Sequence, residues 1–243
     1  MKSARLRALG FVVLALVAAA ALALAAFTER APKQLPPREA SQRPALLLLT
    51  SLPLMFGEDF SLQGGGSPVL TKLQTRYRVV PISVTAPAEL AKGKLLLMAH
   101  PNAQPAEDLV ALDDWVRRGG RVLLLADPML EWPSKRPLGD PLRPSPMFAD
   151  TGLLAHWGLT LEAPAERGPH ERQIAGFRVA TISPGELSGQ CSISADKLIA
   201  DCRVGKGRAI VIGDADWLNV EQIEGGGENL DALLEELARL ERA

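Results

Sequence analysis

The sequence has no excess of charge of either sign: 27 Lys and Arg residues stand against 28 Asp and Glu residues, for a formal net charge of −1. Such a balance gives no long-range field that would attract nucleic acid or an anionic lipid surface. The chain also lacks basic tracts with interleaved aromatic residues, zinc-type Cys/His spacing, a glycine-rich phosphate loop and internal repeats. These absences exclude nucleic-acid-binding, zinc-binding, phosphate-loop and repeat proteins.

Cysteine is scarce, with two residues, Cys191 and Cys202, in the segment QCSISADKLIADC. Residues 192–194 and 197–201 predict two short strands around a turn at 195–197, which would place the two thiols opposite each other. In an oxidising compartment they would form a disulfide worth roughly 2–3 kcal/mol, because the closed loop is short. The alternative is two small, partly buried side chains without a bond.

The chain has one long apolar run, Ala8 to Phe27, which follows the basic residues Lys2, Arg5 and Arg7. About 20 residues of helix match the roughly 30 Å hydrocarbon core of a bilayer, and a helix satisfies its own backbone hydrogen bonds there. The basic residues favour a cytoplasmic N-terminus. The run therefore predicts a single-pass protein of the inner membrane, in contact with lipid through this helix.

The predicted organisation has four parts: a cytoplasmic basic leader at 1–7, a transmembrane signal anchor at 8–27, a Pro-rich linker at 28–43 and a periplasmic domain at 44–243. A cleaved signal peptide is the alternative, because Ala23-Leu24-Ala25 is a small-x-small pattern of the kind that precedes processing sites. An apolar region of 7–15 residues is usual for such peptides, which favours the anchor. Both interpretations export the remaining chain.

The exported part alternates apolar runs with helical patterns. Strands are predicted at 45–50, 78–82, 94–99, 121–126, 159–162, 177–183 and 208–213, and helices at 67–77, 105–118, 147–157 and 229–240. Continuous apolar runs such as ALLLLT at 45–50 are typical of parallel strands covered on both faces. The fold class is therefore α/β, with a doubly wound, mostly parallel sheet and a C-terminal β-hairpin. A long irregular segment, residues 127–146, holds six prolines.

Polar side chains follow the predicted strands, where ligands bind in open α/β sheets. They are Ser51, His100, Asp127, Asp214 and Asp216. A hydroxyl, an imidazole and carboxylates at one edge form a candidate ligand-binding site, or the nucleophile and base of a hydrolase. Such residues also cap helices and brace turns at strand ends.

We favour the structural role for these side chains and predict no catalytic residue, no metal and no cofactor. Ser51 lacks the G-x-S-x-G elbow that exposes a nucleophile, and no cysteine follows an early strand. Asp214 and Asp216 alone offer too few oxygens for a hard cation.

Two segments carry a family resemblance. LLLMAHPNAQPAEDLVALDDWVRRGGRVLLLADP, from Leu95, and GKGRAIVIGDADWLN, from Gly205 to Asn219, resemble segments of bacterial auxiliary ABC-transporter proteins of the gliding-motility type and of related membrane-anchored proteins. The resemblance implies a flavodoxin-related sheet, like that of class I glutamine amidotransferases, without the catalytic cysteine. It also implies a periplasmic module that associates with ABC-transporter permease or ATPase subunits, and it carries over no catalytic residues.

Two functions follow as expectations. The first is a non-enzymatic, membrane-anchored periplasmic accessory or binding module, whose sheet edge or proline-rich segment contacts a partner. The alternative is a hydrolase-like enzyme that uses Ser51, His100, Asp127 and Asp214.

Overall fold

The computed structural model describes residues 34–55 and 66–243. The predicted transmembrane segment at 8–27 lies outside these residues. Within the described part of the chain, no helix is both long enough and apolar enough to cross a membrane.

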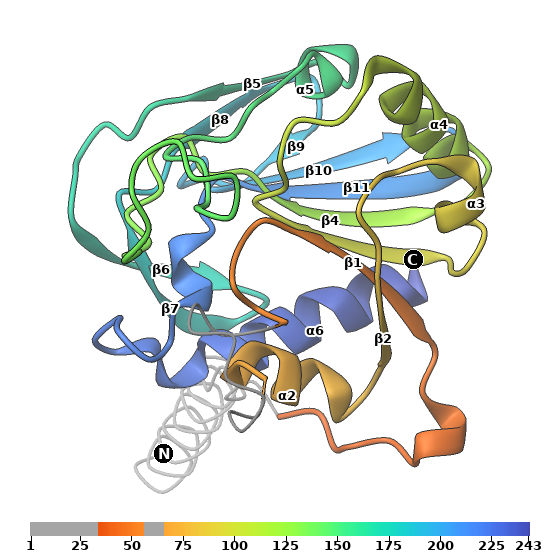
Figure 1. Cartoon of the computed structure of the whole chain (residues 1–243), viewed down its shortest axis with the longest axis horizontal. Helices are drawn as coiled ribbons and strands as arrows, with labels where there is room; N and C mark the ends of the chain where they lie inside the picture. The colour runs from red at the N-terminus through yellow and green to blue at the C-terminus, as the bar shows by residue number, and fades with distance from the viewer. Residues whose placement is uncertain (1–33, 56–65) are drawn as a thin grey trace, which may run out of the picture. The chain divides into compact units, whose positions relative to one another are not determined.

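The described chain is built around a seven-stranded sheet with the order β2-β1-β3-β4-β11-β10-β9 (Figure 1). The pairs that join β2, β1, β3, β4 and β11 are parallel, and β10 and β9 add antiparallel strands at one edge. The bounds are β1 (Ala45–Thr50), β2 (Arg78–Pro81), β3 (Leu95–Ala99), β4 (Arg121–Leu125), β9 (Ser192–Ile193), β10 (Ile199–Val204) and β11 (Gly207–Ile212). This is the predicted mostly parallel α/β sheet with a C-terminal antiparallel addition.

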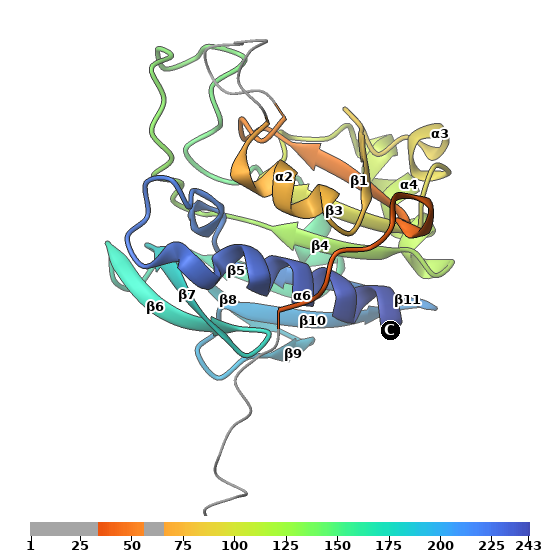
Figure 2. The same ribbon diagram turned by 90° about the horizontal axis from the view of Figure 1, so that it is seen from below.

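Helices cover both faces of the sheet, as Figures 1 and 2 show. On one face, α2 (Pro68–Gln74) and α6 (Asn229–Arg242) pack on side chains such as Leu46, Leu97 and Leu123. On the other, α3 (Pro87–Leu90) and α4 (Ala106–Arg117) pack on the alternate side chains of the same strands, including Leu47 and Leu96. Burial on both faces explains why these strands are continuous apolar runs.

Local sequence signals set the ends of the two clearest helices. Ser67 caps α2, since its Oγ accepts a hydrogen bond of 3.1 Å from the Leu70 N–H, and Pro68 occupies the first turn. After α4 the chain passes through Gly119, whose φ of +111° is the conformation that ends helices at glycine.

Two small antiparallel sheets flank the main sheet: β5 (Leu159–Glu162) with β8 (Glu186–Gly189), and β6 (Pro169–Ile174) with β7 (Phe177–Ile182). The sequence pattern did not predict β6 or β8. The segment PHERQI alternates exposed with partly buried positions but carries one apolar residue, so it has no recognisable hydrophobic period.

The helix predicted at 147–157 is wrong in extent. The structure forms only α5 (Leu153–His156), because Gly152 precedes it with φ +105°, outside the helical region. The Asp150 carboxylate accepts the Gly152 N–H at 3.0 Å and holds that turn.

The described residues of the predicted linker, 34–43, belong to the same compact unit as the α/β domain. Gln34 Nε2 donates to Asp231 of α6 at 2.7 Å, and Arg38 pairs with Glu241 at 2.9 Å, near the end of α6. A short 3₁₀ turn, η1 (Ala40–Gln42), then leads into β1. The second half of the predicted linker is therefore packed on the domain.

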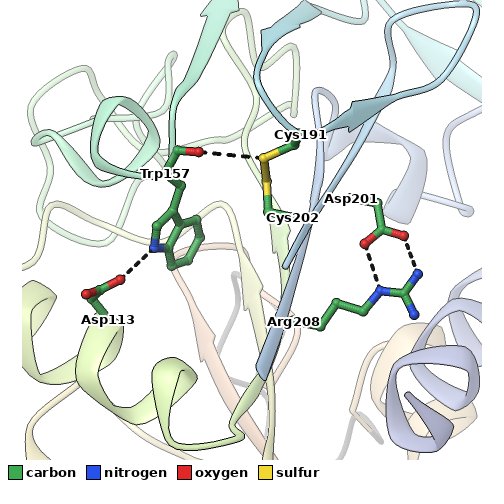
Figure 3. Close-up of a disulfide and its surroundings, with 6 residues drawn as sticks. All are labelled: Asp113, Trp157, Cys191, Asp201, Cys202 and Arg208. Carbon is green, nitrogen blue, oxygen red and sulfur yellow. Dashed lines mark hydrogen bonds and ion pairs between the residues drawn. A yellow bond between two sulfur atoms is a disulfide. The ribbon is translucent and has the colours of Figure 1, made fainter. Parts of the chain in front are cut away.

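Cys191 and Cys202 form a disulfide, the pair that the sequence analysis expected (Figure 3). Antiparallel pairing of Ser192 with Asp201 brings the two cysteines opposite each other. The Cys191 sulfur lies 3.6 Å from the Trp157 carbonyl oxygen, and the Trp157 indole donates to Asp113 of α4 at 2.9 Å. The disulfide therefore lies where β9, β10 and the end of α5 meet.

Candidate functional site

The candidate residues gather at the carboxyl edge, which we define as the edge formed by the C-terminal ends of β1, β3, β4 and β11. Ser51 follows β1, His100 follows β3, Asp127 follows β4 after one residue, and Asp214 and Asp216 follow β11. His100 and the three aspartates are at most 1% exposed, whereas Ser51 is partly exposed.

Ser51 and His100 lie next to each other, but not as a nucleophile and a base. The Ser51 hydroxyl donates a short hydrogen bond to the backbone carbonyl oxygen of His100, not to its ring. The neighbouring Thr50 hydroxyl likewise donates to the Ala99 carbonyl oxygen at 2.8 Å. Both hydroxyls therefore tie β1 to β3 at this edge.

The His100 ring points to the proline-rich segment. Its Nε2 lies 2.9 Å from the Ser145 carbonyl oxygen, which can only accept, so Nε2 carries the proton. Burial lowers the pKa of His100, and this outweighs the opposing effect of the Ser145 hydrogen bond. The neutral ring then leaves Nδ1 as a lone-pair atom, which has no partner among the described residues. His100 also has φ +45°, a conformation uncommon for side chains other than glycine.

Asp127, Asp214 and Asp216 form a carboxylate cluster in which one oxygen of each lies within 4.8 Å of the others. The sequence placed these residues at one edge, but it considered only Asp214 and Asp216 as a pair. Asp127 joins them because β4 and β11 are parallel neighbours, with Leu125 paired to Ile212.

Backbone N–H groups occupy most of the oxygens of this cluster. Asp127 accepts from Met129 at 2.8 Å and from Ala215 at 2.8 Å. Asp214 accepts from Ile182 at 3.1 Å and from Trp217 at 3.2 Å. These bonds fasten the loops that follow β4, β7 and β11 to one another.

Asp216 extends the cluster into the proline-rich segment, since it accepts the Glu131 N–H at 2.7 Å. The Glu131 carboxylate in turn accepts a hydrogen bond of 2.5 Å from the Ser183 hydroxyl. Glu131 and Ser183 were not among the candidate residues of the sequence. Neither follows a strand of the main sheet, so strand-end position gave no signal for them.

Burial keeps the cluster protonated to an unusually high pH. It raises the pKa of Asp127 to about 6, against the lowering effect of the three backbone N–H bonds to that carboxyl. Burial, with repulsion from Asp127 and Glu131, raises the pKa of Asp216 to about 7. Burial and the two neighbouring carboxyls also raise the pKa of Asp214 well above its usual range. Protonation of these carboxyls therefore limits the repulsion between them.

A cavity of about 410 Å³ lies beside the carboxyl edge, between the start of α2 and the 3₁₀ turn after β11. Leu54, Pro68, Trp132 and Leu218 are among the residues that line it. None of the five candidate residues does. The candidate residues therefore hold loops together, and the concave surface nearby is lined by other residues.

A family model described as "ABC-type uncharacterized transport system", the ABC-transporter auxiliary family, matches residues 43–164, half of the chain. The chain belongs to this family. The match runs from the start of β1 through the carboxyl-edge residues Ser51, His100 and Asp127 and the proline-rich segment. No curated protein matches the sequence.

Similar solved structures describe the fold alone. The N-terminal domain of mmIFT52 is 12% identical, with a TM-score of 0.51 over 79% of this chain and 97% of that chain. The cytoplasmic protein STM3548 from Salmonella typhimurium is 9% identical, with a TM-score of 0.48 over 81% and 98%. The exo-β-1,4-mannosidase Op5Man5 from Opitutaceae bacterium strain TAV5 is 11% identical, with a TM-score of 0.48 over 82% of this chain. The chain spans 36% of the length of that mannosidase.

Proposed function

We propose that this protein is a non-enzymatic auxiliary component of an ABC transport system, held in the inner membrane by residues 8–27 with its α/β domain in the periplasm. The domain would use a flavodoxin-like sheet, related to that of class I glutamine amidotransferases, as a binding scaffold for the permease, and it would associate with the ATPase subunit through that permease. Membership of the auxiliary family supports the association with a transporter. The apolar run behind a basic leader supports the anchor and the orientation.

One observation carries the non-enzymatic part of this proposal. The polar side chains of the carboxyl edge bond to the backbone of the loops around them: Ser51 to His100, His100 to Ser145, and Asp127 to Ala215. A catalytic group needs a free atom that faces a substrate in a concave site. The hydrogen bonds of these side chains instead connect the loops of the edge to one another.

The alternative function is a hydrolase that uses Ser51, His100, Asp127 and Asp214. It requires the Ser51 hydroxyl within about 2.6–3.2 Å of an imidazole nitrogen. The same hydroxyl instead donates to the His100 carbonyl oxygen, and the ring donates to Ser145. The alternative would therefore need the Ser51 hydroxyl to exchange this carbonyl partner for a ring nitrogen of His100 before any reaction.

The first experiment tests the membrane topology of the chain. Alkaline phosphatase, which is active only after export, is fused after Ala243, and membranes are extracted with alkaline carbonate. We expect an active reporter that stays in the membrane fraction. An inactive reporter would contradict the orientation, and an active reporter in the soluble fraction would contradict retention alone.

Association is tested on the full chain, tagged at its C-terminus and isolated in a mild detergent. We expect an ABC permease and its ATPase to accompany it in fixed proportion. A matched control carries the same tag on the chain without residues 34–243, and it should recover neither subunit. Recovery of both by the control would assign the contact to the membrane segment rather than to the α/β domain.

A further inference from the structure

Large apolar side chains are exposed on one segment of the surface. Among the described residues, four such side chains are more than half exposed, and three of them lie in the proline-rich segment or directly after it: Leu138 at 78%, Leu142 at 58% and Met147 at 59%. The fourth, Val110, lies on α4. Exposed apolar groups gathered on one segment mark a contact surface.

The tip of this segment, residues 136–143, has a defined structure. Arg143 Nη1 donates to the Arg136 carbonyl oxygen at 2.5 Å, and the Asp140 carboxylate accepts the Leu142 N–H at 2.8 Å. At the base, the Leu130 N–H donates to the Pro146 carbonyl oxygen at 2.9 Å. The two leucines are therefore exposed on a tied turn, which lowers the entropic cost of using them in a contact.

The described chain begins beside the first turn of α6. The proline-rich segment leaves β4 at the carboxyl edge, and α6 also starts on that side, away from the C-terminus (Figure 1). Gln34 Nε2 donates to Asp231 in the first turn of α6, at 2.7 Å. Residues 28–33 separate Gln34 from the end of the apolar run, and so short a segment spans at most about 25 Å.

We propose that the tip and Met147 insert their apolar side chains into the surface of the bilayer that holds the anchor. This inference rests on the proposed membrane anchoring, because the short tether keeps the domain close to that surface at a high effective concentration. Three basic and three acidic residues give the segment no net charge. Apolar burial at the interface, rather than attraction to anionic lipid, drives the contact.

The test uses single introduced cysteines in the full chain. The two native cysteines are joined in the disulfide, so a fluorophore labels only the new thiol. Leu138→Cys and, as a matched control, Val110→Cys both replace exposed apolar side chains. Each protein is reconstituted into phosphatidylcholine vesicles that contain a nitroxide-labelled lipid as quencher. We expect quenching several-fold stronger at position 138 than at position 110.

A second variant separates insertion from mere proximity. The label is placed at Met147→Cys, and Leu138→Asp and Leu142→Asp are added, which change two exposed side chains and should not affect folding. Quenching should then fall to the Val110→Cys level. Quenching that is unchanged by the two aspartates would overturn the inference.

Further outcomes distinguish this inference from the anchor. The chain could resist carbonate extraction while the labels at positions 138 and 110 are quenched equally. That result would overturn the inference but would be consistent with the anchor. Chain released by carbonate whose tip label is still quenched by vesicles would contradict the anchor alone. A photo-crosslinker at position 138 in native membranes should react with lipid, and adducts only to a permease or a second copy would overturn the lipid assignment.

Discussion

At the residue scale, the polar side chains of the carboxyl edge form hydrogen bonds with the backbone of neighbouring loops. The hydroxyl of Ser51, the imidazole of His100 and the carboxylate of Asp127 each have a backbone partner within hydrogen-bond distance. Their residue types suggest chemistry, but their partners decide their role. Strand-end position was thus sufficient to find these residues in the sequence, whereas the choice between catalysis and bracing needed the geometry.

The cysteines give the first prediction at this scale. Purified without reductant, the full chain should show no thiol that reacts with an alkylating agent, because Cys191 and Cys202 are bonded across a separation of 11 residues. Replacement of both by serine should lower the free energy of unfolding by about 2–3 kcal/mol, as the loop model gives for a short loop. Unfolding in reductant should release both thiols as a control, and two labelled thiols per native chain would contradict the bond.

The carboxylate cluster predicts a pH dependence of stability. The folded carboxyl of Asp216, with a pKa of about 7, holds a proton that the unfolded carboxyl, with a value of 3.8, has lost. The native state binds more protons in this window, so its stability falls as pH rises from about 4 to 7, with a limiting slope of about 1.4 kcal/mol per pH unit for one proton. In the Asp216→Asn variant, the free energy of unfolding measured by urea denaturation should fall less over this pH range than in the wild type.

The side-chain amide of the Asp216→Asn variant cannot ionise, and its oxygen can still accept the hydrogen bond from the Glu131 N–H. The same change at exposed Asp114 is the control and should leave the wild-type pH profile intact. A constant difference in unfolding free energy between the wild type and Asp216→Asn across this pH range would contradict the assignment.

At the scale of elements, α6 is fastened to β7 and to the turn after β11 through one amide. Asn229 is fully buried, and its Nδ2 donates to the Ala180 and Trp217 carbonyl oxygens at 2.9 and 2.7 Å. Its Oδ1 accepts the Ala180 N–H at 3.1 Å. The side chain satisfies three backbone groups that would otherwise lie buried without partners.

Asn229→Asp should therefore lower the free energy of unfolding by at least about 2 kcal/mol, because a carboxylate of the same shape cannot donate to the two carbonyl oxygens. Thermal or urea denaturation of the full chain in detergent measures the loss. Gln222→Glu, the equivalent change at an exposed position, should stay within about 0.5 kcal/mol. Equal effects of the two substitutions would show that the amide network contributes nothing.

The elements that could be predicted from sequence are those of the main sheet and its helices. Buried parallel strands such as LLLMA and RVLLL are continuous apolar runs, and α2 and α4 carry cap and glycine signals at their ends. The missed strand β6 owes its place to pairing with β7 rather than to its own composition. The link from Asp216 to Glu131 joins residues 85 positions apart, and no local pattern predicts such a contact.

At the scale of the whole molecule, the family places this chain with auxiliary components of ABC transport systems, and the fold supplies a scaffold whose carboxyl edge is closed by its own loops. We therefore expect function to depend on surfaces, such as the tip of the proline-rich segment, more than on the polar groups of that edge.

His100→Ala tests this account most directly, because the hydrolase alternative requires that imidazole as its base. The substitution removes one neutral hydrogen bond from a buried ring and should cost about 1–2 kcal/mol of stability. Cells that carry the variant in place of the wild type are scored for the phenotype that deletion of the gene causes, with protein level and melting temperature measured in parallel. The account predicts that any loss of function follows the loss of folded protein. A variant that accumulates and melts like the wild type yet abolishes function would contradict it.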